Sequence, residues 1–204
     1  MLLERLTVEK GHKTMAERQK LLLHSCCGPC STTVVERVAG KYDVTLFFYN
    51  PNITDPEEYE RRKTVLLRFL KIYNEKYFSK KTVGFLEGAY DTGRFYEAVK
   101  GAEEAPEGGK RCEKCFELRL GETAKIAGEL GFESFGTTLS VSPHKSYALI
   151  SKIGSLLASH EDIMFLNDDF KKKAGYERSI ALSKEYELYR QNYCGCEFSR
   201  ECKR

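Results

Sequence analysis

Short apolar runs alternate with longer amphipathic stretches along this chain. Five runs have the length and the branched or aromatic side chains of buried strands, and they lie at residues 21–24, 44–49, 81–86, 132–139 and 163–166. Between them, apolar positions recur at helical spacing, which predicts helices at residues 31–39, 94–100, 112–130 and 146–160. A further helix is predicted to begin after Asp55, because an aspartate followed by a proline is a typical helix start.

The alternation of strands and helices predicts an α/β fold with a mainly parallel sheet. The chain has no internal repeat and no low-complexity tract, so we predict one α/β domain over residues 1–204. Within it, residues 1–20 are predicted to form a polar N-terminal arm or helix, and residues 197–204 a tail.

Cysteines and polar residues follow the predicted strands. In parallel α/β sheets, functional sites gather at the carboxyl ends of the strands. The groups in that position here are residues 26–30, Asn50, Asp91, residues 142–145 and Asp169. We therefore predict one combined site at this edge of the sheet.

The composition narrows the class of protein. Hydrophobic residues make up 41% of the chain, which is enough for a core without disulfide staples. The longest apolar runs fall far short of a membrane span of about 20 residues, and residues 1–20 lack the apolar stretch of a signal peptide. The sequence thus predicts a cytoplasmic protein with no membrane partner.

The overall charge does not by itself point to nucleic acid, since the net charge is only +3. The basic residues do gather in runs, at 61–63, 80–81 and 171–173. These runs are either solvated faces or, taken together, an RNA-binding surface.

Eight cysteines dominate the chemistry of the sequence. In a chain without signs of export, clustered cysteines bind metal or carry out redox chemistry more often than they form structural disulfides. Cys27 and Cys30 form the Cys-Gly-Pro-Cys pattern of thioredoxins, but Cys26 adds a third thiol. Three adjacent thiols suit a soft metal better than they suit simple dithiol exchange.

Two further cysteine pairs complete the set. Cys112 and Cys115 lie one turn apart at the start of a predicted helix, where the helix dipole favours thiolates. Gly195 allows the backbone between Cys194 and Cys196 to bend. Seven thiols exceed the four that one zinc ion or one cubane cluster needs, so the count predicts two adjacent metal centres, or one cluster and a redox pair. A single structural zinc site stays open as an alternative.

Other side chains are candidates for the same site. Asp91 and Asp169 either complete a mononuclear iron site or serve as a helix cap and a surface carboxylate. The turn at residues 140–145, which includes Lys145, either holds a phosphate or is a plain turn. His24 is predicted to be a core histidine rather than a ligand.

The stretch before the last cysteine pair is rich in aromatic and basic residues. Tyr189, Arg190 and Tyr193 either stack on and orient an unpaired base or form the end of a surface helix. Phosphate contacts are expected from residues 61–63 and from three consecutive lysines, Lys171, Lys172 and Lys173.

Six stretches, in this order, resemble the QueH family of epoxyqueuosine reductases over about residues 21–199. They are HSCCGPC at 24–30, FYNPNI at 48–53, PEGGKRCEKC at 106–115, TTLSVSPHK at 137–145, DFKKK at 169–173 and YRQNYCGC at 189–196. Cys202 lies outside every matching stretch and is predicted to be dispensable.

The resemblance implies an activity and its cofactors. An enzyme of this family reduces the epoxide of epoxyqueuosine, at the wobble position of a tRNA anticodon, to give queuosine. For this chain it implies a [4Fe-4S] cluster and a second metal ion, expected to be iron, held by some or all of the seven cysteines, with an external electron donor and no cobalamin. An acid, with Tyr193 as one candidate and a bound water as another, would protonate the leaving oxygen.

The resemblance also implies a Rossmann-like fold, similar to that of the ATP-dependent tRNA-thiolating enzymes. Two alternative functions stay open at this point. A cluster-dependent tRNA sulfurtransferase would need ATP and would incorporate sulfur, whereas a non-enzymatic, zinc-stabilised RNA-binding module would be colourless. The sequence leaves the oligomeric state open.

Overall fold

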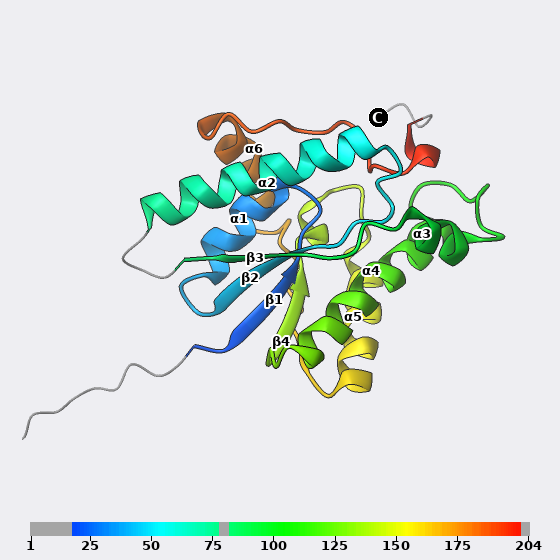
Figure 1. Ribbon diagram of the computed structural model, residues 1–204, viewed down its shortest axis with the longest axis horizontal. Helices are drawn as coiled ribbons and strands as arrows, with labels where there is room; N and C mark the ends of the chain where they lie inside the picture. Colours follow the sequence, from blue (N-terminus) through cyan, green and yellow to red (C-terminus); the bar gives the residue numbers. More distant parts are fainter. Residues whose placement is uncertain (1–17, 78–81, 201–204) are drawn as a thin grey trace, which may run out of the picture.

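A parallel β-sheet forms the centre of the molecule (Figure 1). This computed structural model describes residues 18–77 and 82–200. The strands pair in the order β3-β2-β1-β4-β5, and all four pairings are parallel. Their bounds are Lys20–His24 for β1, Asp43–Phe48 for β2, Gly84–Glu87 for β3, Ser134–Thr137 for β4 and Met164–Phe165 for β5.

Helices cover both faces of this sheet (Figure 1). On one face pack α1 (Gly28–Val38), α2 (Pro56–Lys76) and α6 (Gly175–Glu185). On the other face lie α4 (Lys110–Glu129) and α5 (Tyr147–Glu161), with α3 (Thr92–Val99) against α4. Two short 3₁₀ turns complete the described elements, η2 (Leu139–Val141) and η3 (Glu197–Ser199).

The most apolar strand lies in the middle of the sheet. Leu21, Leu22 and Leu23 of β1 are fully buried, because neighbouring strands flank β1 on both sides and helices cover both of its faces. The order of the strands reverses at β1, which has β2 on one side and β4 on the other. Such a switch point leaves a crevice at the carboxyl ends of the strands, where the chain turns away in opposite directions.

The predicted α/β fold with a Rossmann-like parallel sheet is confirmed. The start of α2 is confirmed as well, because the carboxylate of Asp55 accepts hydrogen bonds from the backbone amides of Glu57 and Glu58, with Pro56 in the first turn. The strand predicted at 81–86 lies in part outside the described residues, and β3 occupies Gly84–Glu87. The fifth strand is shorter than predicted.

The helix α6 was not predicted. Its buried side consists of Gly175, Ser179, Leu182 and Ser183, so the apolar repeat that usually marks a helix is missing. The buried serine hydroxyls donate to backbone carbonyls one turn earlier, at 2.6 Å in both cases. These internal hydrogen bonds let a polar helix face pack against α1.

The chain ends are described only in part. β1 already includes Lys20, and residues 1–17 of the predicted N-terminal arm lie outside the described residues. Cys202 also lies outside them. Beyond α6, residues 186–200, named here the C-terminal segment, return toward the start of α2 and end in η3 (Figure 1). No described helix is both long enough and apolar enough to cross a lipid bilayer.

Candidate functional site

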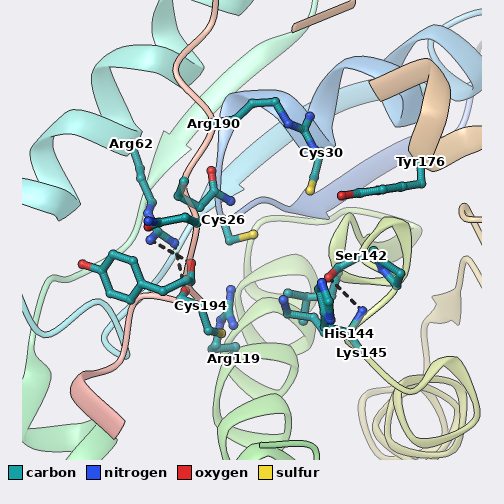
Figure 2. A pocket seen from close by; sticks show the side chains of 15 residues that line it. Cys26, Cys30, Arg62, Arg119, Ser142, His144, Lys145, Tyr176, Arg190 and Cys194 are labelled. Atoms are coloured by element: carbon teal, nitrogen blue, oxygen red, sulfur yellow. Dashed lines mark hydrogen bonds between the residues drawn. The ribbon is translucent and has the colours of Figure 1, made fainter. Parts of the chain in front are cut away.

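A cavity of about 250 Å³ opens at the carboxyl edge of the sheet (Figure 2). Four segments of the chain form most of its walls. Cys26 and Cys30 border it from the turn after β1 and the start of α1, and Arg119 borders it from α4. Lys145 comes from the loop after β4, and Cys194 from the C-terminal segment. The cavity therefore lies at the predicted place, beside the switch point between β1 and β4.

The first group of thiols lies where β1 leads into α1. Cys27 is the N-cap of α1, and Cys26 and Cys30 stand on either side of it, all three buried. The sulfur atoms of Cys26 and Cys27 are 3.9 Å apart, and the Gln191 side-chain amide donates to the Cys27 sulfur at 3.1 Å. At Gly28 a Cβ atom would meet the backbone of α2 at 2.9 Å, so glycine permits the close packing of the two helices here.

The second group of thiols surrounds a smaller cavity of about 20 Å³. Cys112 and Cys115 border it from the first turns of α4, and Cys194 and Cys196 border it from the C-terminal segment. Because Cys194 borders both cavities, the two groups adjoin. All seven described cysteines are free thiols.

The local environment holds the protons on several of the thiols. Burial raises the pKa of Cys115 to about 12, and it also raises the pKa values of Cys112 and Cys196. The contact with the Cys27 thiol, together with burial, raises the pKa of Cys26. Metal binding at these positions would release protons, because the thiolate is the ligand.

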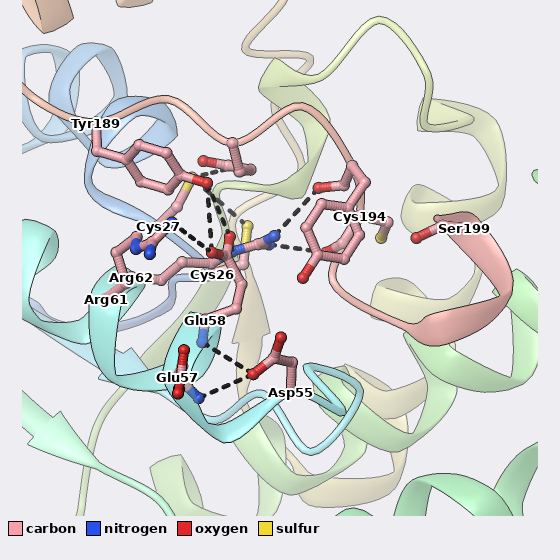
Figure 3. A network of polar contacts seen from close by, with 12 residues as sticks. Cys26, Cys27, Asp55, Glu57, Glu58, Arg61, Arg62, Tyr189, Cys194 and Ser199 are labelled. Atoms are coloured by element: carbon pink, nitrogen blue, oxygen red, sulfur yellow. Dashed lines mark hydrogen bonds and ion pairs between the residues drawn. The ribbon is translucent and has the colours of Figure 1, made fainter. Parts of the chain in front are cut away.

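A buried arginine of α2 fixes the C-terminal segment (Figure 3). Arg62 is only 1% exposed, and its two terminal nitrogens donate to the carbonyls of Cys194 at 2.8 Å and Tyr193 at 3.2 Å. Its Nε donates to the buried carboxylate of Glu58 at 2.7 Å, and the Tyr189 hydroxyl donates to the same carboxylate at 3.3 Å. The charge of Arg62 is thus balanced, and each nitrogen of its guanidinium donates a hydrogen bond.

The bend predicted at Gly195 is confirmed. Its φ of +117° lies in the left-handed half of the map, where side chains other than hydrogen are strained. A Cβ atom would also stand 2.9 Å from Ile53 and 3.1 Å from the guanidinium of Arg62. The backbone between Cys194 and Cys196 therefore requires glycine at this position.

A second arginine is buried below the large cavity. Arg119 of α4 is fully buried and donates to the Asn50 side-chain oxygen at 2.7 Å and to Nε2 of His24 at 3.3 Å. Its Nη1 lies 3.9 Å from the sulfur of Cys115. None of the ion pairs found among residues 18–77 and 82–200 involves Arg119.

The prediction that His24 is a core residue is confirmed. The ring is fully buried and borders neither cavity. Nδ1 lies 3.1 Å from the hydroxyl of Thr137, and Nε2 lies 3.1 Å from the carbonyl of Tyr49. Burial, followed by the charge of Arg119, keeps the pKa of His24 well below its usual value.

The two predicted carboxylate ligands border neither cavity. Asp91 is exposed and caps α3 by accepting from the amide of Gly93 at 2.9 Å. Asp169 forms an ion pair with Lys171 at 3.2 Å, and the same ammonium lies 3.4 Å from the carbonyl of Lys145. Asp169 is therefore tied to the wall of the large cavity, while Asp91 has the helix-cap role. Metal binding by either residue stays a prediction.

The residues predicted to contact substrate divide into two sets. Lys145, Arg190 and Tyr193 border the large cavity, whereas Tyr189 does not. The guanidinium of Arg190 donates to the backbone and side chain of Ser179, so α6 holds this residue in place.

The three consecutive lysines also differ from one another. Lys171 is half-buried and is bonded within the protein, as its ion pair with Asp169 shows. Lys172 and Lys173 are exposed, and their backbone carbonyls accept hydrogen bonds from Arg37 at 3.0 and 3.1 Å. Only the last two are available as a charged surface.

Sequence reasoning missed several residues of the site. Arg62 lies in a basic run that was expected to face solvent or to contact phosphate, and for Arg62 this expectation is wrong because the side chain is buried. The available signal was Glu58, four positions earlier on the same helix face. Arg119 lies on the face of α4 that carries two cysteines, where an apolar residue is usual. Tyr176 borders the large cavity from α6, the helix that the apolar pattern did not reveal.

The residues fit a soft metal by their chemistry. Within the described ranges, no three cysteine, histidine, aspartate or glutamate side chains already converge in an arrangement that could hold a metal ion. Six thiols nevertheless line two adjoining cavities, and the seventh, Cys27, lies beside Cys26. Four of the six surround the smaller cavity, which is the number that a cubane cluster needs. Because that cavity measures only about 20 Å³, its thiols would have to move apart to admit a cluster.

Fold and site together define a class of protein: a Rossmann-like α/β protein with a thiol-lined cavity at the switch point of its sheet. Comparison with protein families identifies the group within that class. The family described as epoxyqueuosine reductase QueH matches residues 21–202, and the chain belongs to this family.

Relatives from several bacteria support the assignment. A protein of Streptococcus pyogenes serotype M1 named epoxyqueuosine reductase QueH is 42% identical over 182 residues, which cover 89% of this chain and 71% of the relative. The protein of that name from Staphylococcus epidermidis is 42% identical over 90% of this chain and 77% of its own length. The one from Thermotoga maritima is 38% identical, with 88% and 89% covered.

Proposed function

We propose that this chain is an oxidoreductase that converts epoxyqueuosine in tRNA to queuosine. In the reaction the two C–O bonds of the epoxide break and a C=C bond forms, while two electrons and two protons convert the oxygen to water. One observation carries the proposal: in a chain of the QueH family, a cavity of about 250 Å³ has thiols in its wall and a second group of thiols directly behind them. Neither a sulfurtransferase nor a zinc-stabilised module gains support from the comparisons.

The thiols divide naturally between two metal centres. Cys112, Cys115, Cys194 and Cys196, around the smaller cavity, would hold a [4Fe-4S] cluster. Residues 26–30, with Cys26 and Cys30 at the larger cavity and Cys27 beside Cys26, would hold the second metal, expected to be iron. When bound, these groups supply single-electron transfer and a Lewis acid for the epoxide oxygen, without cobalamin.

A carboxylate is expected to complete the second centre, with Asp91 and Asp169 as the candidates. Asp169 is the better placed, because Lys171 links it to the loop that forms a wall of the cavity. The two possibilities are separable by Asp91→Asn and Asp169→Asn. The correct change should remove about one iron and most activity while the cluster absorbance survives.

The chain's own side chains would bind and orient the substrate. Lys145 and Arg190 border the cavity and offer cationic donors to the modified nucleoside and its phosphate. Tyr193 is the proposed proton donor. Arg200 donates to the hydroxyl oxygen of Tyr193 at 3.2 Å, which leaves the hydroxyl hydrogen free for transfer.

The outer rim would hold the anticodon loop. Tyr189 is 36% exposed, and the guanidinium of Arg61 lies 5.2 Å from its ring, so the pair presents a flat cationic surface. Unpaired bases stack on such surfaces, whereas A-form helices hide their base edges. Exposed Lys172 and Lys173 would contact phosphates. A tRNA substrate implies action in the cytoplasm with an external electron donor.

The test is an anaerobic assay on tRNA that contains epoxyqueuosine, read by mass spectrometry of the nucleosides. The iron- and sulfide-loaded protein with a low-potential reductant should produce queuosine without added cobalamin or ATP. Protein loaded with zinc alone is the matched control and should produce none. If the iron-loaded protein leaves epoxyqueuosine intact, or inserts sulfur into tRNA when ATP is supplied, the proposed reaction is wrong.

A further inference from the structure

We infer that Arg119 is the internal counter-charge of the metal centre, which balances the negative charge of metal-bound thiolates and raises the reduction potential of the centre. The inference deepens the proposed function, because it rests on the metal centre proposed there. It concerns a residue that contacts the Cys115 thiol and is placed below the cavity, not one that contacts the substrate.

The burial of Arg119 requires an explanation. Its side chain is fully buried in α4, where a guanidinium without an anionic partner is costly. Arg62 is equally buried, but the carboxylate of Glu58 balances its charge at 2.7 Å. No ion pair found among the described residues does the same for Arg119.

The polar partners of Arg119 cannot supply the missing negative charge. Asn50 offers an amide oxygen at 2.7 Å, and the ring of His24 offers Nε2 at 3.3 Å. Neither group forms an anion in a protein at ordinary pH. The remaining neighbour is the sulfur of Cys115, 3.9 Å from Nη1, and a cysteine becomes an anion when it ligates a metal.

Helix geometry places the guanidinium of Arg119 beside the thiols. Cys112, Cys115 and Arg119 stand at positions i, i+3 and i+7 of α4, which share one face of a helix. The guanidinium also borders the large cavity, and Figure 2 shows it on the side of Cys194. The guanidinium of Arg119 therefore lies between the two groups of thiols and can act on both.

A fixed positive charge has a predictable effect on a redox centre. A cluster gains negative charge when it is reduced, so a buried cation beside it favours the reduced state. It also favours binding of the metal, because outer groups of this kind typically change metal affinity by about 10- to 100-fold. Lys145, which is only half-buried, can instead be hydrated when no anion is present.

The test compares variants that remove the charge with variants that keep it. Arg119→Met and Arg119→Gln both lose the charge, and Arg119→Lys keeps it. Each protein is reconstituted anaerobically with ferrous iron and sulfide, and iron content and midpoint potential are measured without tRNA. The Met and Gln variants should have a more negative potential and about 10- to 100-fold weaker iron retention against a chelator, while the Lys variant should stay near wild type.

Two controls separate charge from structure. Arg94→Met removes an arginine that pairs with Glu122 of the same helix as Arg119 at 3.0 Å, and it should leave the potential unchanged. Asn50→Ala removes the shortest hydrogen bond of Arg119 but keeps its charge. If Asn50→Ala shifts the potential as far as Arg119→Gln, or if the Gln or Met variant matches wild type in potential and iron, the inference is wrong.

Failure of the inference about Arg119 can be distinguished from failure of the proposed reaction. Wild-type protein that binds iron and sulfide but does not reduce epoxyqueuosine would contradict the reaction, and the comparison of potentials would still decide the role of Arg119. Wild-type protein that binds no iron would contradict both. Should Arg119→Met fail to fold, as circular dichroism would show, Arg119→Gln supplies the decisive comparison because it retains a hydrogen-bonding side chain.

Discussion

The start of α1 and the C-terminal segment bring thiols to the same cavity, but different forces hold the two regions. Cys26, Cys27 and Cys30 lie in the turn between a buried central strand and the helix that covers it, so backbone hydrogen bonds and core packing place them. Cys194 and Cys196 lie in a stretch without regular structure, and side chains from α2 hold its backbone.

The difference shows which part of the site depends on distant residues. A strand–turn–helix keeps its shape as long as the core is intact, whereas the carbonyls of Tyr193 and Cys194 both depend on one arginine, so one substitution removes both hydrogen bonds. Arg62 and Glu58 are thus as necessary to the second region as the core leucines are to the first.

Replacing Cys194 by serine should have the largest effect, because this thiol borders both cavities. We expect loss of most bound iron and a fall in activity of at least about 100-fold. Cys30→Ser, in the other region, should leave more iron bound, since Cys30 borders only the large cavity. Iron and sulfide analysis checks both, with Cys202→Ser as a control expected to match wild type. Full iron content in the Cys194 variant would contradict the prediction.

Glu58→Gln should destabilise the fold. The change leaves the buried guanidinium of Arg62 without its carboxylate, and breaking a buried pair in this way costs about 3–5 kcal/mol. Glu60→Gln on the same helix is the matched control, because the Glu60 side chain is 61% exposed and pairs with Lys63 at the surface. It should change the free energy of unfolding by less than about 0.5 kcal/mol. Denaturant titration measures both, and equal effects would contradict a stabilising role of the buried Glu58–Arg62 pair.

Gly195→Ala should cost about 1–3 kcal/mol, because φ at this position is +117° and a Cβ atom would crowd Ile53. The bound iron should fall at the same time, since the bend sets the separation of the last two cysteines. Gly40→Ala serves as the control: its Cβ atom would meet nothing within 4 Å, and φ there is not positive. Thermal unfolding and iron analysis together give the answer, and a stable Gly195 variant with full iron would count against a required bend.

The smallest effect is expected at the exposed lysines. Lys172→Gln combined with Lys173→Gln should raise the KM for tRNA without lowering kcat. The slope of log affinity against log salt should become shallower by about 0.7 for each phosphate that the variant no longer neutralises. Lys171→Gln should act differently, because this lysine bonds to Asp169 and to the loop that carries Lys145. Unchanged salt dependence in the double variant would mean that these lysines form only a solvated face.

Much of the fold was predictable because its signals are local. The central strand is a continuous apolar run, and Asp55 and Pro56 mark the start of α2. The helix α6 was not predicted because serines, not apolar residues, form much of its buried side. Their hydroxyls donate to backbone carbonyls of the same helix, and this compensation is visible only when the helix is folded.

The site was predictable in part. The positions after strands correctly pointed to the carboxyl edge of the sheet, where six of the seven described thiols border two adjoining cavities. Arg119 was not predicted as part of the site, and Arg62 was expected to contact phosphate although it is buried, because a charged residue in a basic run or on a helix face is normally solvated. Whether such a charge is buried depends on what the rest of the chain packs over it. The C-terminal segment, about 130 residues away in the sequence, packs over Arg62 and buries it.

The late position of the C-terminal segment also has a consequence for assembly in the cell. Cys194 emerges from the ribosome roughly 80 residues after Cys115, a delay of roughly 4–16 s at about 5–20 residues per second. During that interval five thiols are already made, while the residues that complete the smaller cavity are not. The nascent chain therefore passes through a period in which these five thiols are present without the two that complete the smaller cavity.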